Sequence, residues 1–228
     1  MRIGVIAALP AELKPLVRRA QKMPVARGSG IAMWDWEVGD NQVVAVCAGM
    51  GAAAARRAFT AAEFAGSLDA VLSVGWSGAL TASAKLRECY AVSEVVDSLT
   101  GERFALGVSG ERLVTTGHVA NSIEKVRLAA SYGASLVDME AAAVARLAQM
   151  RGIPMACFKA VSDGMDASLP DLNPFIDVDG KMRMAAFLAY IAMRPQFWFP
   201  LAQLGSNSAA AAQALAKVTE VFLQDVRF

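Results

Sequence analysis

Along the whole chain, short apolar segments rich in Val and Ile alternate with segments rich in alanine, and this alternation constrains the fold most strongly. The apolar segments predict strands and the alanine-rich segments predict helices. Elements that alternate in this way build a sheet with helices on both of its faces. The sequence therefore predicts an α/β fold, a three-layer sandwich with a central mixed β-sheet flanked by helices, built as one domain over residues 1–228.

The expected elements follow one another closely. Strands are expected at residues 2–9, 32–38, 42–49, 70–80, 89–98, 112–119, 135–140 and 155–163. Helices are expected at residues 51–66, 122–132, 141–151, 181–193 and 206–224. The second and third strands are expected to pair as a hairpin, because the turn sequence Gly39-Asp40-Asn41 separates them.

Charge and composition exclude several classes of function. The net charge is +1 and no basic run stands out, so nucleic acid is not expected as a partner. No apolar run reaches the roughly 18 residues that a transmembrane helix needs, and the N-terminus reads as a first strand rather than a signal peptide. The three cysteines are dispersed without a metal-binding spacing, which suits reduced thiols in a cytoplasmic protein.

Polar residues and glycines gather where the predicted strands end, and this is where α/β sheets bind their ligands. Glu12 follows the first strand, Gly49 to Gly51 follow the third, and Ser162 and Asp163 end the last. Each has a structural interpretation as well: Glu12 as an acid in a first helical turn, the glycines as a tight turn, Asp163 as a helix N-cap. Because such residues recur at several strand ends, a ligand site is favoured.

Two acids stand where an apolar strand meets an alanine-rich helix. Asp138 and Glu140 alternate with Met139, so on a strand both carboxylates would point to one face of the sheet. Buried carboxylates are unfavourable unless each accepts hydrogen bonds. The donor could be a ligand that carries hydroxyl groups or a basic side chain of the protein.

Five segments, taken in order, resemble one family. "RIGVIAALPAEL", the Gly49–Gly51 loop, "VGWSGAL", "VDMEAAAVA" and "KAVSDGMD" are similar to the nucleoside phosphorylase and methylthioadenosine/S-adenosylhomocysteine nucleosidase superfamily. Residues 169–215 resemble the hopanoid-associated phosphorylases of that superfamily. The resemblance implies that adenine is released from adenosylhopane, a nucleoside whose ribose carries a pentacyclic hydrocarbon. It implies no metal and no organic cofactor.

The resemblance also implies roles for single residues. Met139 would pack against the ribose, and Glu140 would accept hydrogen bonds from the ribose hydroxyls. Asp163 would protonate adenine N7, with Ser162 orienting it, because adenine leaves poorly as an anion. Glu12 would hold and activate the attacking water.

Two further segments match the family less closely. Val119 falls in the segment that contacts the base, and the neighbouring His118 would either touch the ligand or serve the structure. Lys159 stands where the nucleosidases often carry arginine, so a cation is retained there.

Whether water or phosphate attacks the ribose stays open at this stage. Phosphorylases carry an arginine and a serine around the glycine loop of the fourth strand, whereas this chain has Ser73 and Trp76. Ser77 lies next to Trp76, and the backbone N–H groups of Gly49 and Gly51 could hold an anion. The bulky Trp76 either reshapes the pocket beside the ribose or packs into the sheet.

Two rival functions share these residues. The first is a methylthioadenosine/S-adenosylhomocysteine-type or other purine nucleosidase, and the second is a nucleoside-binding protein without catalysis. A homodimer is expected from the resemblance. The aromatic run Phe197 to Phe199 is expected on an irregular segment, either as a dimer contact or as a peripheral contact with a membrane.

Overall fold

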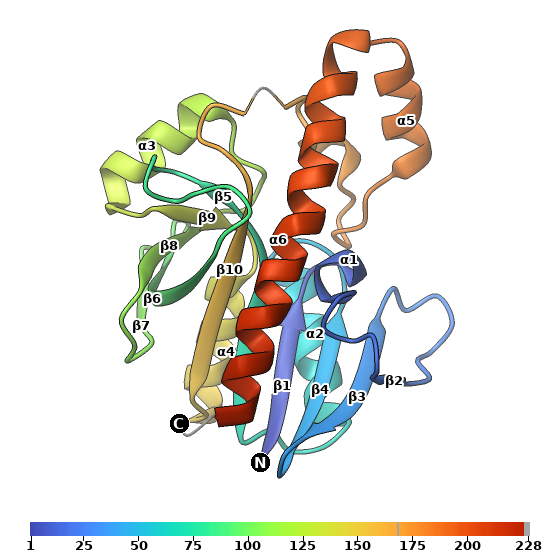
Figure 1. Ribbon diagram of the computed structural model, residues 1–228, viewed down its shortest axis with the longest axis vertical. Helices are drawn as coiled ribbons and strands as arrows, with labels where there is room; N and C mark the ends of the chain where they lie inside the picture. Colours follow the sequence, from blue (N-terminus) through green and yellow to red (C-terminus); the bar gives the residue numbers. More distant parts are fainter. Residues whose placement is uncertain (168, 226–228) are drawn as a thin grey trace.

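The computed structural model describes residues 1–167 and 169–225, and it confirms the predicted fold class (Figure 1). One mixed sheet holds the strands β1 (Arg2–Ala7), β2 (Gln21–Lys22), β3 (Ala32–Val38), β4 (Asn41–Cys47), β5 (Ala70–Ala79), β6 (Cys89–Asp97), β7 (Arg103–Ala105), β8 (Glu111–Thr115), β9 (Leu136–Asp138) and β10 (Met155–Asp163). The helices are α1 (Pro10–Leu13), α2 (Ala52–Phe64), α3 (Ser122–Tyr132), α4 (Ala141–Arg151), α5 (Met184–Ala192) and α6 (Trp198–Asp225). Short 3₁₀ turns lie at Asn173–Phe175 and Pro195–Phe197.

The sheet is open at one end and closed into a ring at the other. Strands β4, β1, β5 and β10 run parallel, so their carboxyl ends meet at one edge. β10 also pairs with β6, and the path through β8 and β9 returns to β5, so five strands close on one another. The sequence predicted a mixed sheet but not this closure.

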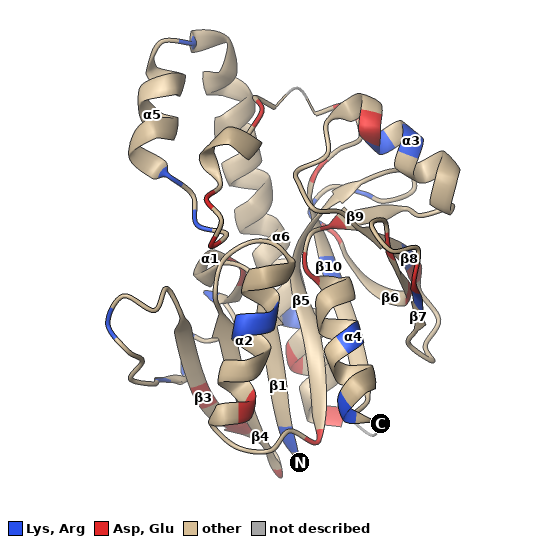
Figure 2. Ribbon diagram, turned by 180° about the vertical axis from the view of Figure 1, so that it is seen from behind, with Lys and Arg blue, Asp and Glu red and all other residues tan. Residues whose placement is uncertain are grey.

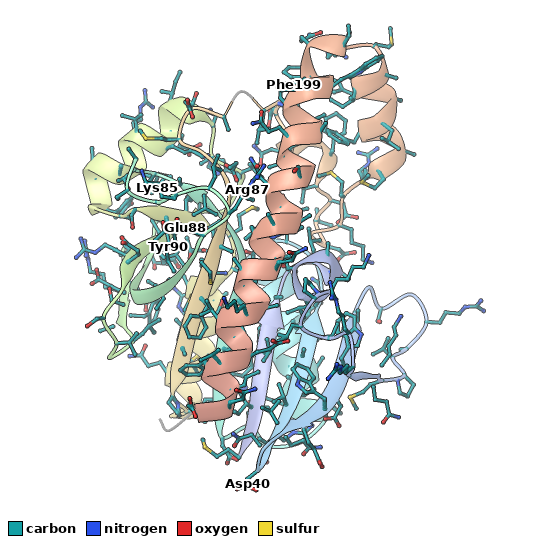
Figure 3. The ribbon with its side chains drawn as sticks, viewed as in Figure 1. Asp40, Lys85, Arg87, Glu88, Tyr90 and Phe199 are labelled. Carbon is teal, nitrogen blue, oxygen red and sulfur yellow. The ribbon has the colours of Figure 1, made fainter. Side chains whose placement is uncertain are left out.

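Helices cover the two faces of the sheet, and the sheet separates two hydrophobic cores. α2 and α4 lie side by side on one face, where Phe59 is fully buried (Figure 2). α6 crosses the other face, and the ring of its Phe222 packs edge-on against Phe158 of β10 at 5.0 Å. Leu215 and Leu223 of α6 are buried there too, and each contributes about 1.5–3 kcal/mol through removal of apolar surface from water. Arg87 Nε donates to Asn207 Oδ1 of α6 at 2.8 Å and fixes the helix over the loop that follows β5 (Figure 3).

Most expected elements are confirmed, and the main difference lies at the C-terminus. The helix expected at residues 206–224 begins eight residues earlier, at Trp198. Trp198 and Phe199 are therefore helical, and only Phe197 lies outside α6, in a 3₁₀ turn. The early start is possible because Pro200 falls in the first turn of α6, where its missing N–H is not needed.

α5 and the first part of α6 form a helical hairpin that projects from the body (Figure 1). Its base crosses the glycine loop that follows β4: Met50 N donates to Gly180 O at 2.8 Å. Gly180 has a φ of +75°, and a Cβ there would lie 2.0 Å from Met50 O. Arg57 of α2 donates to Asp179 O at 2.6 Å, which adds a second hydrogen bond at the place where the hairpin base crosses the loop. The base of the hairpin is thus held against the glycine loop after β4 and against α2 by these hydrogen bonds.

Replacing Gly180 by alanine should destabilise the protein more than replacing Gly28. Both residues have positive φ, and each alanine bears a backbone strain of roughly 1–2 kcal/mol. Only the Cβ at position 180 meets the backbone, since nothing lies within 4 Å of one built at Gly28. The displaced backbone adds about 1–3 kcal/mol. We expect a lower melting temperature for Gly180→Ala than for Gly28→Ala; equal melting temperatures would show that the crossing does not constrain the fold.

Candidate active site

A cavity of about 300 Å³ lies at the edge where the parallel strands end. It gathers residues from many separate elements and loops, among them the ends of β5, β9 and β10. The predicted site residues on its wall are Glu12, Ser77, Val119, Met139, Glu140, Ser162 and Asp163. Gly49 and Gly51 are not on this wall, although Met50 between them is.

Glu12 enters the cavity from α1 and is held by backbone donors. Its Oε2 accepts hydrogen bonds from the N–H groups of Ala8 and Leu9 at 2.9 and 2.8 Å, and its Oε1 accepts from Trp76 N at 2.9 Å. Gly75 permits this approach, because a Cβ there would lie 2.9 Å from Oε1. Glu12 thus accepts hydrogen bonds from backbone amides at the start of α1, as its structural interpretation predicted, and it also lines the cavity. Burial raises the pKa of Glu12, although the backbone hydrogen bonds oppose this shift.

Asp138 serves the structure, and its partner is a lysine. Lys159 Nζ lies 2.8 Å from Asp138 Oδ2, and both side chains are almost fully buried. Thr115 Oγ1 donates to Oδ1 at 2.6 Å, and Ala141 N at the start of α4 donates to Oδ2 at 2.9 Å. Burial is the largest single influence and lowers the pKa of Lys159, but the negative groups around it, Asp138 first, together outweigh burial and raise that pKa. Of the two donors that the sequence allowed for Asp138, the basic side chain is the one present.

Glu140 is not on the strand face where the sequence placed it. β9 ends at Asp138, and Glu140 is the N-cap residue of α4, so the strand alternation stops before it. Gly51 N donates to Glu140 Oε1 at 2.6 Å. Burial, and then the charge of Asp138, raises the pKa of Glu140 to about 7, while Lys159 opposes the shift. Glu140 is therefore a carboxylate of variable charge on the wall of an otherwise apolar cavity.

The glycine loop offers no free amide to an anion, contrary to the prediction from sequence. Gly49 N donates to Ala8 O at 3.0 Å, Met50 N to Gly180 O, and Gly51 N to Glu140. All three donors are already occupied, one of them by a carboxylate. Ser77 Oγ is buried without a hydrogen-bond partner among the described residues.

Asp163 forms an ion pair that the sequence did not reveal. Lys125 of α3 contacts Asp163 Oδ2 through its Nζ and also donates to Gly164 O at 2.6 Å. Ser162 Oγ donates to Asp163 Oδ1 at 2.8 Å, so the carboxylate is held on both oxygens. Asp163 ends β10 and is not a helix N-cap. The signal in the sequence was a charge on an apolar helical face, since Lys125 precedes the buried Leu128 by three residues.

The remaining predicted residues lie around the mouth of the cavity. The side chain of Asn173 binds both backbone groups of Val119, accepting from its N at 2.8 Å and donating to its O at 3.1 Å. His118 also lines the cavity, but its Nε2 lies 2.7 Å from Glu124 Oε1 and its side chain is half exposed. The ring of Trp76 both lines the cavity and packs against the core on the α6 side, so its two interpretations are compatible.

The charges of the site do not balance. Glu12, Asp138 and Glu140 share one buried cation, Lys159, while Asp163 has Lys125 to itself. The wall around them is apolar, with Leu9, Met50, Leu169, Leu172, Met182 and Leu204. An excess of negative charge in an apolar site favours a ligand on which positive charge is present or develops.

Solved structures of similar fold are nucleosidases and a hydrolase. The chain superposes on a 5′-methylthioadenosine/S-adenosylhomocysteine nucleosidase of Helicobacter pylori with a TM-score of 0.74 at 15% identity, covering 99% of both chains. A futalosine hydrolase mutant of the same organism gives 0.74 at 14% identity, covering 99% of this chain and 100% of that one. The 5′-methylthioadenosine nucleosidase of Arabidopsis thaliana gives 0.73 at 18% identity, covering 100% and 97%. At these identities the likeness establishes the fold.

Membership of a family rests on the sequence profile. No curated protein sequence matches the chain. The profile of the phosphorylase superfamily matches residues 2–120 and 109–192, which together span most of the chain and include every acid of the cavity. The sequence motifs at the strand ends suggested this superfamily, and the match confirms it. The chain belongs to the phosphorylase superfamily of enzymes.

Proposed function

We propose that this enzyme cleaves the N-glycosidic bond of an adenine nucleoside that carries an apolar 5′ substituent, and that this nucleoside is adenosylhopane. The observation that carries the proposal is the presence of Glu12, Glu140 and Asp163 on the wall of one small, mostly apolar cavity. The similar folds of purine nucleosidases support the reaction type.

The ribose would lie against Glu140 and Met139. As the bond between C1′ and N9 breaks, its electron pair leaves with the base and positive charge grows on the ribose. Glu12 and Glu140 supply the negative charge that stabilises this cation, and they act more strongly in the transition state than in the ground state. Glu140 Oε2 has only a weak protein donor, Met139 N at 3.3 Å, so it retains capacity for a ribose hydroxyl.

The base would lie against Asp163, and the proton for N7 would come through the Lys125–Asp163 pair. Lys125 Nζ contacts Asp163 Oδ2 and its side chain is buried, so a proton can pass between the two groups directly. We infer that Asp163 passes a proton from Lys125 to N7 as the bond between C1′ and N9 breaks. The step leaves neutral adenine, a carboxylate and a neutral amine, and solvent then returns the proton to Lys125.

Water is the nucleophile that the geometry favours. The amides of the glycine loop are occupied, and Arg57 is bound to backbone carbonyls at the hairpin base, so a phosphate would find few donors. Glu12 keeps one acceptor position on Oε1, at which it would hold a water beside C1′ and take a proton from that water as its oxygen bonds to C1′.

The apolar wall supports an apolar 5′ substituent over an amino-acid one. Homocysteine would bring an ammonium and a carboxylate, and the wall contributed by residues 169–204 offers leucine and methionine at Leu169, Leu172, Met182 and Leu204. Methylthioadenosine would also suit this wall and is the second candidate. A cavity of about 300 Å³ holds a nucleoside but not an attached pentacyclic hydrocarbon, so the hydrocarbon of adenosylhopane would extend out past the hairpin.

The function is tested by incubating the enzyme with adenosine, methylthioadenosine and adenosine bearing a long 5′ alkyl chain, with and without phosphate. We expect free adenine and a sugar without phosphate, identified by mass spectrometry, with the highest kcat/KM for the long-chain nucleoside. Asp163→Asn should lose adenine release by at least ~10²-fold, the scale of one general acid. The matched control is Asp40→Asn, at an exposed acid in the β3–β4 turn far from the cavity (Figure 3), which should keep full activity. Phosphorylated sugar would overturn water as nucleophile, and no adenine from any substrate would overturn the function.

The variants Lys125→Met and Lys125→Arg distinguish two roles of Lys125, the supply of a proton and the supply of a positive charge. Arginine keeps the positive charge but does not give up a proton, because its pKa exceeds ~12. If Lys125 supplies the proton, both variants should lose kcat for adenine nucleosides by about 10²-fold. Both should retain cleavage of 4-nitrophenyl riboside, whose leaving group needs no proton. Full activity of Lys125→Arg on adenine nucleosides would show that only the charge matters.

Glu140→Gln should lower activity and raise stability together. In the folded protein the pKa of Glu140 is raised to about 7, so between its ordinary value near 4.5 and about 7 the folded state binds more protons than the unfolded state. Stability should therefore fall as pH rises through this window, and glutamine should remove that loss. At pH 8 we expect a higher melting temperature for the variant, since each kcal/mol shifts it by about 2–4 °C. A variant as unstable as wild type at pH 8 would contradict the charge balance described above.

A further inference from the structure

We propose that the outer surface of the α5–α6 hairpin docks onto an anionic phospholipid membrane. This surface, the hairpin patch, consists of Met184, Leu188, Met193, Trp198 and Phe199. The docking is argued from the hairpin itself; only its purpose, to meet a lipid-bearing nucleoside, rests on the proposed function.

The hairpin patch is apolar and faces solvent. Met193 is 83% exposed and Phe199 is 76% exposed, and the other three members are each more than half exposed. All five lie on the part of the chain that projects from the body (Figure 1), and Figure 3 marks Phe199 near the outer end of α6. A cluster of large apolar side chains of this kind marks an interaction site.

The hairpin has a core of its own that does not use the patch. The ring of Phe175 packs against Phe187 at 5.4 Å and against Tyr190 at 5.1 Å, on the inner side of α5. At the turn, Trp198 Nε1 donates to Ile191 O at 2.9 Å, so this indole is fixed at the surface. The packing within the hairpin therefore does not explain why these large apolar side chains are exposed on its surface.

The charged residues near the patch favour binding to a negatively charged membrane surface. The sequence has no Asp or Glu from residue 180 to residue 219, whereas Lys181, Arg183 and Arg194 flank α5. Figure 2 shows blue segments at the turn and at the foot of α5, and no red on α5. The Arg194 guanidinium lies 3.8 Å over the Tyr190 ring and is held at the turn. Each basic residue near an anionic bilayer contributes about 1 kcal/mol.

A second copy of the chain suits this surface less well. In a two-fold symmetric dimer the same patch would face itself, and Arg194 at the turn would meet no acid of α5 or of the first part of α6; the acids Asp177 and Asp179 lie at the hairpin base. A bilayer supplies both complements at once, phosphate headgroups for the arginines and acyl chains for the apolar side chains.

The patch also connects with the site. A second groove runs from Ser162 and Asp163 to Phe199 and is lined between them by Leu169, Pro200 and Leu204. Leu204 belongs to the wall of the cavity as well. The groove also presents the polar residues Asp166, Gln203 and Asn207, and its apolar side chains form one wall of a path from the cavity to the patch. In the described part of the chain no helix is long and apolar enough to cross a membrane, so the contact is peripheral.

Co-sedimentation with vesicles tests the docking. Wild type should bind vesicles of phosphatidylcholine with 30% phosphatidylglycerol, bind pure phosphatidylcholine at least ~10-fold more weakly, and lose binding at high salt. The triple variant Met184→Ser/Leu188→Ser/Met193→Ser, which leaves the hydrogen bond of Trp198 at the turn intact, should lose binding at least ~10-fold while keeping its rate on methylthioadenosine. The control variant Phe64→Ser/Leu99→Ser replaces two side chains that are 91% and 88% exposed elsewhere, and it should bind like wild type.

Several outcomes overturn the docking. The first is that wild type does not bind anionic vesicles, and the second is that the triple variant binds them as well as wild type does. In the third, neither protein binds vesicles, and sedimentation velocity shows a dimeric wild type but a monomeric triple variant. The last result would assign the patch to a second copy. Vesicle binding without cleavage of any nucleoside would leave the docking intact and overturn the proposed function alone.

Discussion

The buried ion pair between Lys159 and Asp138 is the interaction on which the rest of the site depends. Asp138 joins β9 to β8 through Thr115 and starts α4 through Ala141 N, so its position fixes Glu140 two residues later. Lys159, on β10, is the cation that the carboxylates of Glu12 and Glu140 share with Asp138. Removal of one partner of such a pair leaves a buried charge alone, at a cost of about 3–5 kcal/mol. The pair therefore sets both the geometry and the charge of the cavity.

One short loop connects the hairpin with this charged centre. Consecutive amides of the glycine loop donate in two directions, Met50 N to Gly180 at the hairpin base and Gly51 N to Glu140 in the cavity. Arg57 binds Ala48 O at the start of the loop and Asp179 O in the hairpin base. Gly49 and Gly51 both have positive φ, which favours glycine at these positions, and the hydrogen bonds leave the amides of the loop no donor for an anion.

Much of the fold and part of the site could be predicted from local patterns. Apolar runs located the strands, and the residues after them located Glu12, Ser162 and Asp163, because a strand end is visible in the sequence. The partners of these residues were not predictable, since each lies on a distant element. Lys125 reaches Asp163 from α3, and β10 closes the ring by pairing with β6; both contacts depend on tertiary packing. The alternation that suggested one face for Asp138 and Glu140 failed because the strand ends at Asp138 and Glu140 already caps the helix that follows.

The position of β10 in the sheet has a consequence for how the chain is made. β10 lies between β5 and β6, yet it follows both in the sequence by more than 50 residues and is the last strand to be synthesised. At about 5–20 residues per second, a ribosome leaves β5 and β6 with unpaired edges for several seconds before the strand that covers them emerges. Exposed edges of apolar strands are templates for pairing with other chains. A nascent chain of this enzyme is therefore most prone to associate wrongly just before β10, with Asp163 at its end, leaves the exit tunnel.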